Sequence, residues 1–166
     1  MQEVKIYTDG ACRGNPDGPG GYAAVLLYRD NKTEREHRKE ISGGLKNTTN
    51  NRMELMGAIA GLEALNKPCR VKLYSDSQYL VNAFNKGWLV KWQNNDWFRD
   101  KRKKEKVKNL DLWLRFLEAV KPHQVEFIWV RGHDGNPENE RCDELAVSAA
   151  LSEDLVEDTE RIKESD

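Results

Sequence analysis

Four acidic side chains are placed where they could act together. Asp9 ends a predicted strand and Asp76 ends another, whereas Glu54 and Asp143 lie near the starts of two predicted helices. If those helices pack on the sheet that holds both strands, the four carboxylates converge at its edge. Clustered carboxylates raise one another's pKa, and a hard dication such as Mg²⁺ relieves the repulsion. Two such ions about 4 Å apart can stabilise the attacking and leaving oxygens of phosphodiester hydrolysis.

Each of these acids also has a structural interpretation when it is considered alone. Asp9 precedes a glycine and suits a turn, and Asp76 precedes a serine and suits a helix cap. Glu54 has capping-box spacing from Asn51, and Asp143 near a helix N-terminus suits the helix dipole. Residue types and spacing therefore permit a metal site without requiring one.

The pattern of apolar residues predicts an α/β fold with the element order β-β-β-α-β-α-α-α-β-α. The three early strands suit an antiparallel meander, and the two later strands, each reached through helices, suit parallel additions. We therefore expect a five-stranded mixed sheet flanked by helices. The expected strands span residues 4–9, 22–28, 33–42, 71–75 and 125–129. The expected helices span residues 50–66, 77–85, about 88–92, 109 or 111 to 121, and 137–150.

The length of the chain suits one domain. With 166 residues it can enclose a single core, so we expect one domain over residues 1–150 and a flexible acidic tail over 151–166. No apolar run approaches the roughly 18 residues that a membrane span needs. The three cysteines, Cys12, Cys69 and Cys142, are widely spaced, which favours a reducing cytoplasmic location over a disulfide framework. We also expect a monomer, because no predicted helix has a spare apolar face.

The net charge of −1 hides two strongly charged blocks. Residues 99–108 contain seven basic and two acidic residues, whereas residues 153–166 contain seven acidic and two basic residues. A polyanionic partner responds to such a local field and not to the total charge. The first block therefore favours nucleic-acid binding, although basic runs are often simply solvated surfaces.

Four local motifs occur in one order along nearly the whole chain, from about Val4 to Ala150. Together they resemble the type 1 ribonucleases H, as found in the bacterial ribonuclease HI family. Each motif alone is moderately specific, and the ordered set is highly specific. The motifs are Tyr7-Thr8-Asp9-Gly10-Ala11-Cys12 with Gly14-Asn15-Pro16, Thr48-Thr49-Asn50-Asn51-Arg52-Met53-Glu54-Leu55, Tyr74-Ser75-Asp76-Ser77-Gln78-Tyr79, and Val130-Arg131-Gly132-His133 with Asn136-Pro137-Glu138-Asn139-Glu140-Arg141-Cys142-Asp143-Glu144-Leu145-Ala146.

The resemblance implies a ribonuclease H-like fold, with residues 1–150 as one catalytic domain. It implies an endonuclease that hydrolyses the RNA strand of RNA–DNA hybrids and leaves 5′-phosphate and 3′-hydroxyl ends. Two Mg²⁺ ions would be bound with substrate, and Mn²⁺ would be a substitute. Asp9 would bridge the ions, and Glu54 and Asp76 would complete the ion nearer the leaving 3′-oxygen. Asp143 would help hold the ion that activates the attacking water.

His133 is a further catalytic candidate. It is flanked by Gly132 and Gly135, which would allow its loop to swing, and an unperturbed pKa of roughly 6.5 suits proton shuttling. A lone histidine is more often a surface or hydrogen-bonding residue. The resemblance assigns His133 an auxiliary role in water activation or product release.

Recognition of the hybrid requires contacts to the 2′-hydroxyl on the RNA strand and to phosphates on the DNA strand. We expect the first from the 10–16 loop, Asn15, Asn50, Glu54 and Gln78. Asn50 has an alternative role as a helix cap. The resemblance assigns a DNA phosphate to Thr49, whose hydroxyl and neighbouring amides stand at a helix start.

Residues 86–108 resemble the basic protrusion of many bacterial members of the family. Its tryptophans have spacings that are more often packing than base contact, whereas its basic run favours phosphate binding. The sequence departs from the family between the second and third tryptophans, where residues 93–96 are neutral to acidic and the positive charge lies downstream. A second departure is a small insertion at Asp17-Gly18. The candidate contacts are Trp88, Arg99, Lys101, Arg102, Lys103 and Lys104.

Two other functions remain open at this stage. A DNA nuclease of the same fold would use a similar acidic cluster, and a non-catalytic module would bind the hybrid on a decayed fold. A purely structural α/β domain would explain each acid singly but not the set. The 10–16 loop, the Thr49–Leu55 motif and the basic protrusion favour the RNA–DNA hybrid as substrate.

Overall fold

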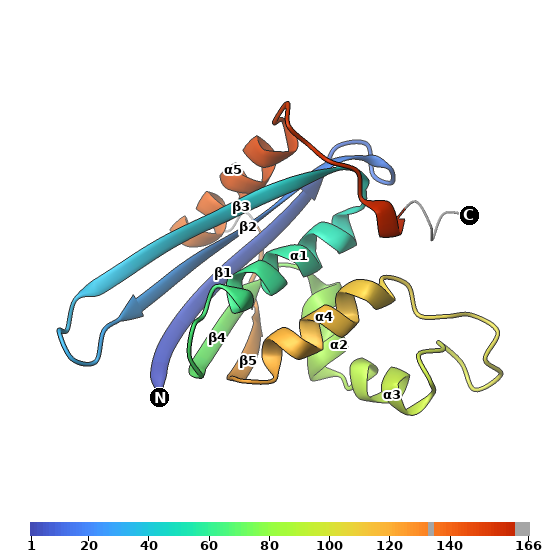
Figure 1. Ribbon diagram of the computed structural model, residues 1–166, viewed down its shortest axis with the longest axis horizontal. Coiled ribbons are helices and arrows are strands. Elements are labelled where there is room, and N and C mark those ends of the chain that lie inside the picture. The colour runs from blue at the N-terminus through green and yellow to red at the C-terminus, as the bar shows by residue number, and fades with distance from the viewer. Residues whose placement is uncertain (133–134, 162–166) are drawn as a thin grey trace.

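The computed structural model describes residues 1–132 and 135–161, and these form one sheet with helices on both faces (Figure 1). The α/β class, the five-stranded mixed sheet and the element order are as predicted. The strands of the described residues are β1 (Gln2–Cys12), β2 (Gly18–Arg29), β3 (Glu36–Thr48), β4 (Cys69–Ser75) and β5 (Gln124–Trp129). The helices are α1 (Asn50–Glu63), α2 (Gln78–Asn85), α3 (Trp88–Asn94), α4 (Leu110–Val120) and α5 (Pro137–Ala150).

The strand order is β3-β2-β1-β4-β5. The first three strands pair antiparallel, and β4 and β5 add in parallel beyond β1. Antiparallel strands can be joined by short connections, whereas each parallel addition requires a crossover, and here helices supply both crossovers. The predicted meander with two parallel additions is therefore confirmed.

Helix α1 lies between the sheet and α4, which explains why almost all of its sides are buried (Figure 1). Its apolar stripe of Leu55, Ile59 and Leu62 is at most 1% exposed and belongs to the main core. Helix α5 covers the opposite face over β1, β2 and β3. A smaller apolar cluster under α5 includes Val25 and Ala146.

All five strands are longer than the sequence pattern predicted, and β1 and β3 show the physical reasons. Strand β1 continues three residues past Asp9 because its far end still pairs with β2. Strand β3 runs from Glu36 to Thr48, not from 33 to 42. Its start is delayed by a turn in which the Asp30 carboxylate accepts hydrogen bonds from two following amides. Its glycine-containing end was missed because Gly44 packs beneath Leu155, a contact made only in the folded chain.

Residues 151–161, which we expected to form a flexible tail, are docked on the domain in the structure. This segment returns across the end of β3, where Val156 pairs with Leu45, and then reaches the start of α1 (Figure 1). Asp158 is 5% exposed and forms an ion pair with Arg52 at 2.7 Å. The acidic composition of the tail predicted solvation, but this carboxylate neutralises a guanidinium that is itself 2% exposed.

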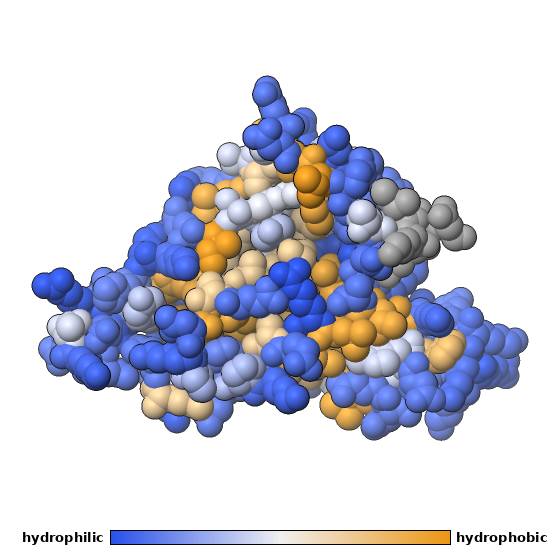
Figure 2. All heavy atoms as spheres, in the orientation of Figure 1, coloured by the Kyte–Doolittle hydropathy of each residue, from blue (hydrophilic) through white to orange (hydrophobic). Residues whose placement is uncertain are grey.

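The protrusion packs its aromatic side chains inward and presents its charges outward. The Trp92 ring lies 5.8 Å from that of Trp113 and 6.3 Å from that of Trp88, so the tryptophans extend the main core. The loop from α3 to α4 is closed by pairing between Phe98 and Lys106. It projects from the body at the lower right of Figure 1, and the same region is strongly hydrophilic in Figure 2. No helix in the described part of the chain is long and apolar enough to span a membrane.

Candidate active site

Asp9 and Asp76 lie near each other because they follow the position at which the parallel strands β1 and β4 stop pairing and separate. The ladder between β1 and β4 ends at the pair Tyr7 and Tyr74, whose rings stack at 4.5 Å. Asp9 and Asp76 each follow two residues later in the sequence. A notch beyond the carboxyl ends of parallel strands is where α/β sheets commonly bind ligands.

Glu54 reaches this notch because α1 packs unusually close to β1. A side chain at Gly10 would place its Cβ 2.4 Å from the Glu54 backbone nitrogen, so only glycine permits the approach. The Gly10 amide donates to Asp9 Oδ1 at 2.9 Å and to Glu54 Oε1 at 3.2 Å. The helix cap is Thr49, whose hydroxyl accepts from the Arg52 amide. Glu54 is therefore not part of a capping box and has its carboxylate in the notch.

Asp76 is likewise not a helix cap. Ser77 caps α2 by accepting from the Leu80 amide at 3.2 Å. The Trp129 indole donates to the Asp76 carbonyl at 3.3 Å, which fixes the backbone beside the carboxylate. Gly132 also lies close, since a Cβ there would be 2.7 Å from Asp76 Oδ2.

Asp143 approaches the notch from the opposite face of the sheet. Asn136 caps α5, and the Cys142 thiol donates to the Tyr7 carbonyl at 3.2 Å, which fixes the helix on β1. Asp143 then lines the same hollow as Asp9. Asp143 lies farther from the other three acids than they lie from one another. Among the described residues, the cluster whose carboxylate oxygens all lie within 4.8 Å of one another consists of Asp9, Glu54 and Asp76.

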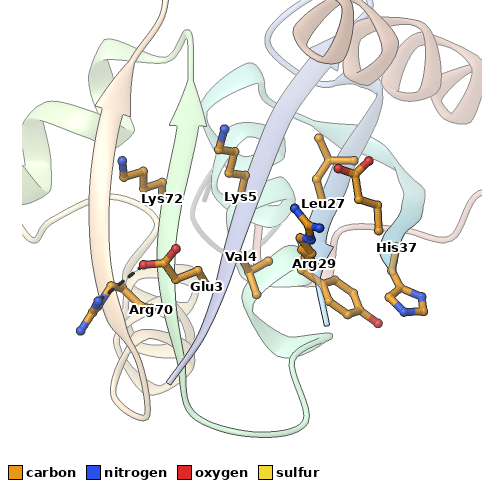
Figure 3. Close-up of a pocket in the computed structure, with 10 residues that line it drawn as sticks. Glu3, Val4, Lys5, Leu27, Arg29, His37, Arg70 and Lys72 are labelled. Atoms are coloured by element: carbon orange, nitrogen blue, oxygen red, sulfur yellow. Dashed lines mark ion pairs between the residues drawn. The ribbon is translucent and has the colours of Figure 1, made fainter. Parts of the chain in front are cut away.

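The hollow at the notch has a volume of about 390 Å³ and is mainly polar. Six of the predicted site residues contribute to its wall, so the structure brings together positions that are up to 134 residues apart in sequence. These six residues are Asp9, Asn50, Glu54, Asp76, Gln78 and Asp143. A second hollow, of about 420 Å³, lies on the exposed face of the sheet near Lys5, Leu27 and Lys72 (Figure 3). It contains none of the predicted site residues.

The hollow at the notch is built to hold positive charge. Burial, and then the nearby Asp76, raise the pKa of Asp9 to about 7. Burial and the charges of Asp9 and Asp76 raise the pKa of Glu54 well above its usual range. Glu54 Oε2 is buried and has no hydrogen-bond partner among the described residues. Crowded carboxylates with an unsatisfied oxygen fit a hard divalent cation, which prefers oxygen ligands.

The raised pKa of Asp9 predicts that the metal-free protein loses stability as pH rises. The folded state retains a proton up to about pH 7, whereas the unfolded carboxyl releases it near pH 3.8. This contribution is therefore fully present below the lower value and is lost as pH rises through the higher one. We expect Asp9→Asn to be more stable than the wild type above pH 7, by up to about 4 kcal/mol, and the difference to vanish near pH 4.

Urea unfolding in EDTA at several pH values measures this difference. Mg²⁺ should stabilise the wild type at about pH 8 and have much less effect on the Asp9→Asn variant, because binding to the folded state shifts the equilibrium. A stability difference between the two proteins that does not change with pH would contradict the assignment.

The other predicted residues that the structure describes lie outside the wall of the hollow at the notch. Thr49 and Asn15 line a neighbouring hollow, where Asn15 Oδ1 accepts from the Asn50 amide at 3.2 Å. Asn50 is the first residue of α1 and not its cap. The basic candidates at 99–104 lie on the exposed protrusion loop. His133 is outside the described residues.

Among the basic candidates, two are engaged with acids on their own loop. Arg99 lies 3.4 Å from Glu105, and Lys103 lies 2.6 Å from Asp96. Within the described part of the chain, Lys101, Arg102 and Lys104 form no ion pair. Trp88 is half-buried and packs against Trp92, as the spacing indicated.

Two residues that were not among the predicted site residues support the site from beneath. Arg52 is buried and bonded to two carboxylates, and Trp129 holds the backbone of Asp76. A signal for Arg52 was present, because it continues the stripe of Leu55, Ile59 and Leu62 one turn earlier. A charged residue on a buried stripe requires a buried partner.

A mixed sheet with three carboxylates clustered where its parallel strands separate defines a metal-dependent enzyme of phosphate-ester chemistry. The sequence matches the family model described as RNase H over residues 1–151. The chain belongs to the ribonuclease H family, whose members depend on divalent metal ions.

Similar proteins agree with this assignment. A Ribonuclease H of Lachnoclostridium phytofermentans is 62% identical over 94% of this chain and 97% of its own length. A Ribonuclease H of Syntrophus aciditrophicus is 59% identical over 95% of this chain and 86% of its own length. The crystal structure of a type 1 RNase H with the type 2 active-site motif superposes with a TM-score of 0.80 at 34% identity. That comparison covers 90% of this chain and 72% of the other.

Proposed function

We propose that this protein is an endonuclease that hydrolyses the RNA strand of RNA–DNA hybrids. The observation that carries the proposal is the cluster of Asp9, Glu54 and Asp76, whose oxygens lie within 4.8 Å of one another in a family of metal-dependent nucleases. Mg²⁺ is the ion that best suits carboxylates in an open, polar hollow where substrate phosphates would supply further ligands. Mn²⁺ would be a substitute.

The carboxylates have separate tasks in this proposal. Asp9, Glu54 and Asp76 would hold one ion, and Asp143, across the hollow, would join Asp9 in holding a second. The bound ions would supply Lewis-acid stabilisation of charge on the attacking and leaving oxygens. The chain itself contributes rigidity before substrate arrives, since the Gly10 amide donates to the Asp9 and Glu54 carboxylates and the Trp129 indole donates to the backbone carbonyl of Asp76.

The reaction is a hydrolysis at phosphorus. The oxygen of a water molecule forms a bond to phosphorus, the bond from phosphorus to the 3′-oxygen breaks, and that oxygen takes up a proton. The products then carry a 5′-phosphate and a 3′-hydroxyl. We assign His133 an auxiliary part in proton transfer or product release.

Recognition of the two strands would use the walls of the two adjacent hollows. Asn50 and Gln78 line the hollow of the carboxylates, and they would contact the 2′-hydroxyl of the RNA strand together with Glu54 and the 10–16 loop. Thr49 lines the neighbouring hollow and would bind a phosphate of the DNA strand. Asn15 supports both, because it joins the 10–16 loop to the start of α1.

The protrusion would add phosphate contacts away from the cut. Lys101, Arg102 and Lys104 are the strongest candidates, since they are exposed and form no ion pair within the described residues. Arg99 and Lys103 would first have to leave their acidic neighbours. Trp88 would act through packing of the protrusion on the core.

Matched duplexes of one sequence test the proposed function directly. RNA–DNA, RNA–RNA and DNA–DNA duplexes, each with labelled strands, are incubated with and without Mg²⁺ and analysed on a denaturing gel. We expect cutting of the RNA strand of the hybrid alone, and only with the ion. Cutting of the DNA–DNA duplex would indicate a DNA nuclease of the same fold, and tight hybrid binding without cutting would indicate a non-catalytic module.

A further inference from the structure

The C-terminal segment delivers a positive charge to the hollow that adjoins the active site. This hollow has a volume of about 420 Å³ and lies at the N-terminus of α1. Its wall contains two cations, Lys108 and Arg161, and no carboxylate among the described residues. The wall of the carboxylate hollow has the opposite character, and Asn50 and Asn51 belong to both.

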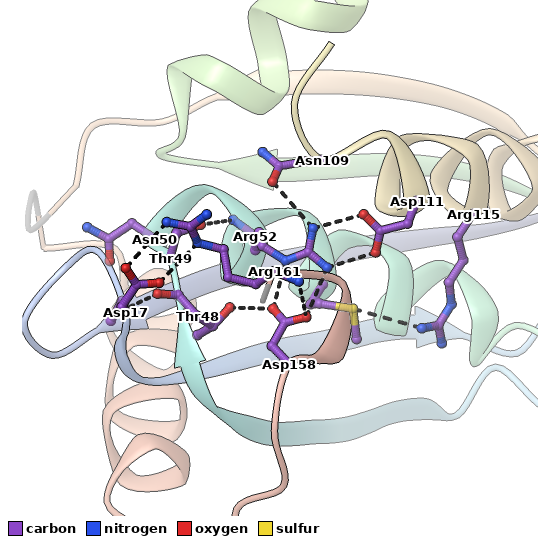
Figure 4. A network of polar contacts seen from close by, with 12 residues as sticks. Asp17, Thr48, Thr49, Asn50, Arg52, Asn109, Asp111, Arg115, Asp158 and Arg161 are labelled. Carbon is purple, nitrogen blue, oxygen red and sulfur yellow. Dashed lines mark hydrogen bonds and ion pairs between the residues drawn. The ribbon is translucent and has the colours of Figure 1, made fainter. Parts of the chain in front are cut away.

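Arg161 is held at this place by the network that anchors the segment (Figure 4). Asp158 accepts from the Arg52 guanidinium at 2.7 Å and from the Thr48 hydroxyl at 2.7 Å. The same carboxylate accepts from the Arg161 amide at 3.3 Å, so it also begins the helical turn that carries Arg161. The backbone at Arg161 is therefore positioned by Asp158, which the buried Arg52 and the Thr48 hydroxyl hold in place.

With respect to the described residues, the guanidinium of Arg161 keeps unused donor capacity. Its partner among the described residues is Asp17, with Nε 3.2 Å from Oδ1 and Nη2 3.5 Å from Oδ2. These contacts are long, and Nε is buried without an aligned hydrogen bond. An arginine carries five N–H donors, so most of its capacity remains for another anion. Asp17 is 52% exposed and is not in the wall of the hollow.

We propose that Arg161 binds a phosphate of the DNA strand, the same phosphate that we propose for Thr49, and that Asp17 holds the guanidinium in place until substrate arrives. The inference rests on the proposed function and adds a residue to it. A planar guanidinium gives bidentate contacts to phosphate oxygens, and Lys108 adds a second positive charge on the wall. A phosphate can engage the guanidinium donors that the Asp17 carboxylate, at 3.2 and 3.5 Å, does not use.

The test is hybrid binding in EDTA, measured by fluorescence anisotropy over a range of salt concentrations. Arg161→Gln should weaken binding roughly five- to tenfold near about 0.1 M salt and reduce the slope of log K against log salt by about 0.9. Arg161→Lys should restore the slope because it retains the charge. Arg29→Gln removes an exposed, ion-paired cation from the β2–β3 turn at the other end of the molecule and should leave the slope unchanged.

A scan with neutral methylphosphonates along the DNA strand identifies the contact. At one position the substitution should weaken wild-type binding and have little further effect on Arg161→Gln, which is the signature of coupled partners. Thermal unfolding of both Arg161 variants controls for loss of the fold. Equal salt slopes for wild type and Arg161→Gln, or no coupled position, would overturn the inference. Failure of the wild type to prefer the hybrid over DNA–DNA would instead overturn the proposed function.

Discussion

Replacing Asp9 by asparagine should abolish hybrid cleavage and leave the protein folded. The substitution keeps the shape of the side chain and an oxygen for the Gly10 amide, but it removes one negative charge from the centre of the cluster. We expect cleavage to fall by at least about 1,000-fold, which corresponds to roughly 4 kcal/mol of transition-state stabilisation. The measurement is the initial rate of RNA-strand cutting at saturating Mg²⁺.

The combination of lower activity and higher stability makes this prediction specific. A variant that merely unfolded would lose both, whereas relief of repulsion at Asp9 should raise the stability of the metal-free protein above pH 7. Asp30→Asn is the matched control, because Asp30 lies in the turn after β2 and only binds neighbouring amides. Retention of wild-type cleavage by Asp9→Asn would refute the metal site.

Replacing Asp158 by alanine should cause a large loss of stability, greater than that caused by breaking an exposed ion pair. Arg52 is 2% exposed and donates to Asp158 through Nε and Nη2, at 2.7 and 3.1 Å. Without the Asp158 carboxylate, the buried guanidinium keeps its ion pair with Asp111 but loses one of the two negative charges that neutralise it. Removal of one partner from a buried pair commonly costs about 3–5 kcal/mol. For a domain of this size the expected fall in Tm is roughly 10 °C.

An exposed ion pair provides the comparison. Glu34→Gln removes the partner of Arg29, where both side chains are more than half exposed, and should change the unfolding free energy by less than about 1 kcal/mol. Calorimetry of both variants measures the contrast. If the Asp158→Ala and Glu34→Gln variants had the same Tm, the C-terminal segment would not be docked in solution. If it is docked, the same variant should also weaken hybrid binding, because Arg161 then loses its support.

The carboxylate site could be predicted because its parts are local. Asp9 and Asp76 follow recognisable strands, and Glu54 and Asp143 lie within recognisable helices. The alternating and helical periods that identify these elements are properties of short segments, so they can be read without knowledge of the fold. The order of the motifs then identified the family that the comparisons confirm.

The sequence alone left each acid with a second interpretation, and the tertiary structure removed it for Glu54 and Asp76. The glycine at position 10 is one residue among several in its loop, but in the fold it is the point where α1 meets β1. Thr49 and Ser77 prove to be the helix caps, which leaves Glu54 and Asp76 for the notch. Such assignments depend on distances between segments, and local propensity does not contain them.

The C-terminal segment shows most clearly that local sequence does not determine contacts between distant segments. Its composition determines that it is acidic, and acidity alone predicts solvation. Its docking depends on contacts with residues far away in the sequence. The buried guanidinium of Arg52 lies 106 positions from Asp158, and the Thr48 hydroxyl and the pairing of Val156 with Leu45 add to it. The sequence by itself thus determined the elements, the family and the acidic site. Only the tertiary structure decided which charges are buried together, because the free energy of a buried charge depends on the partner that the fold places beside it.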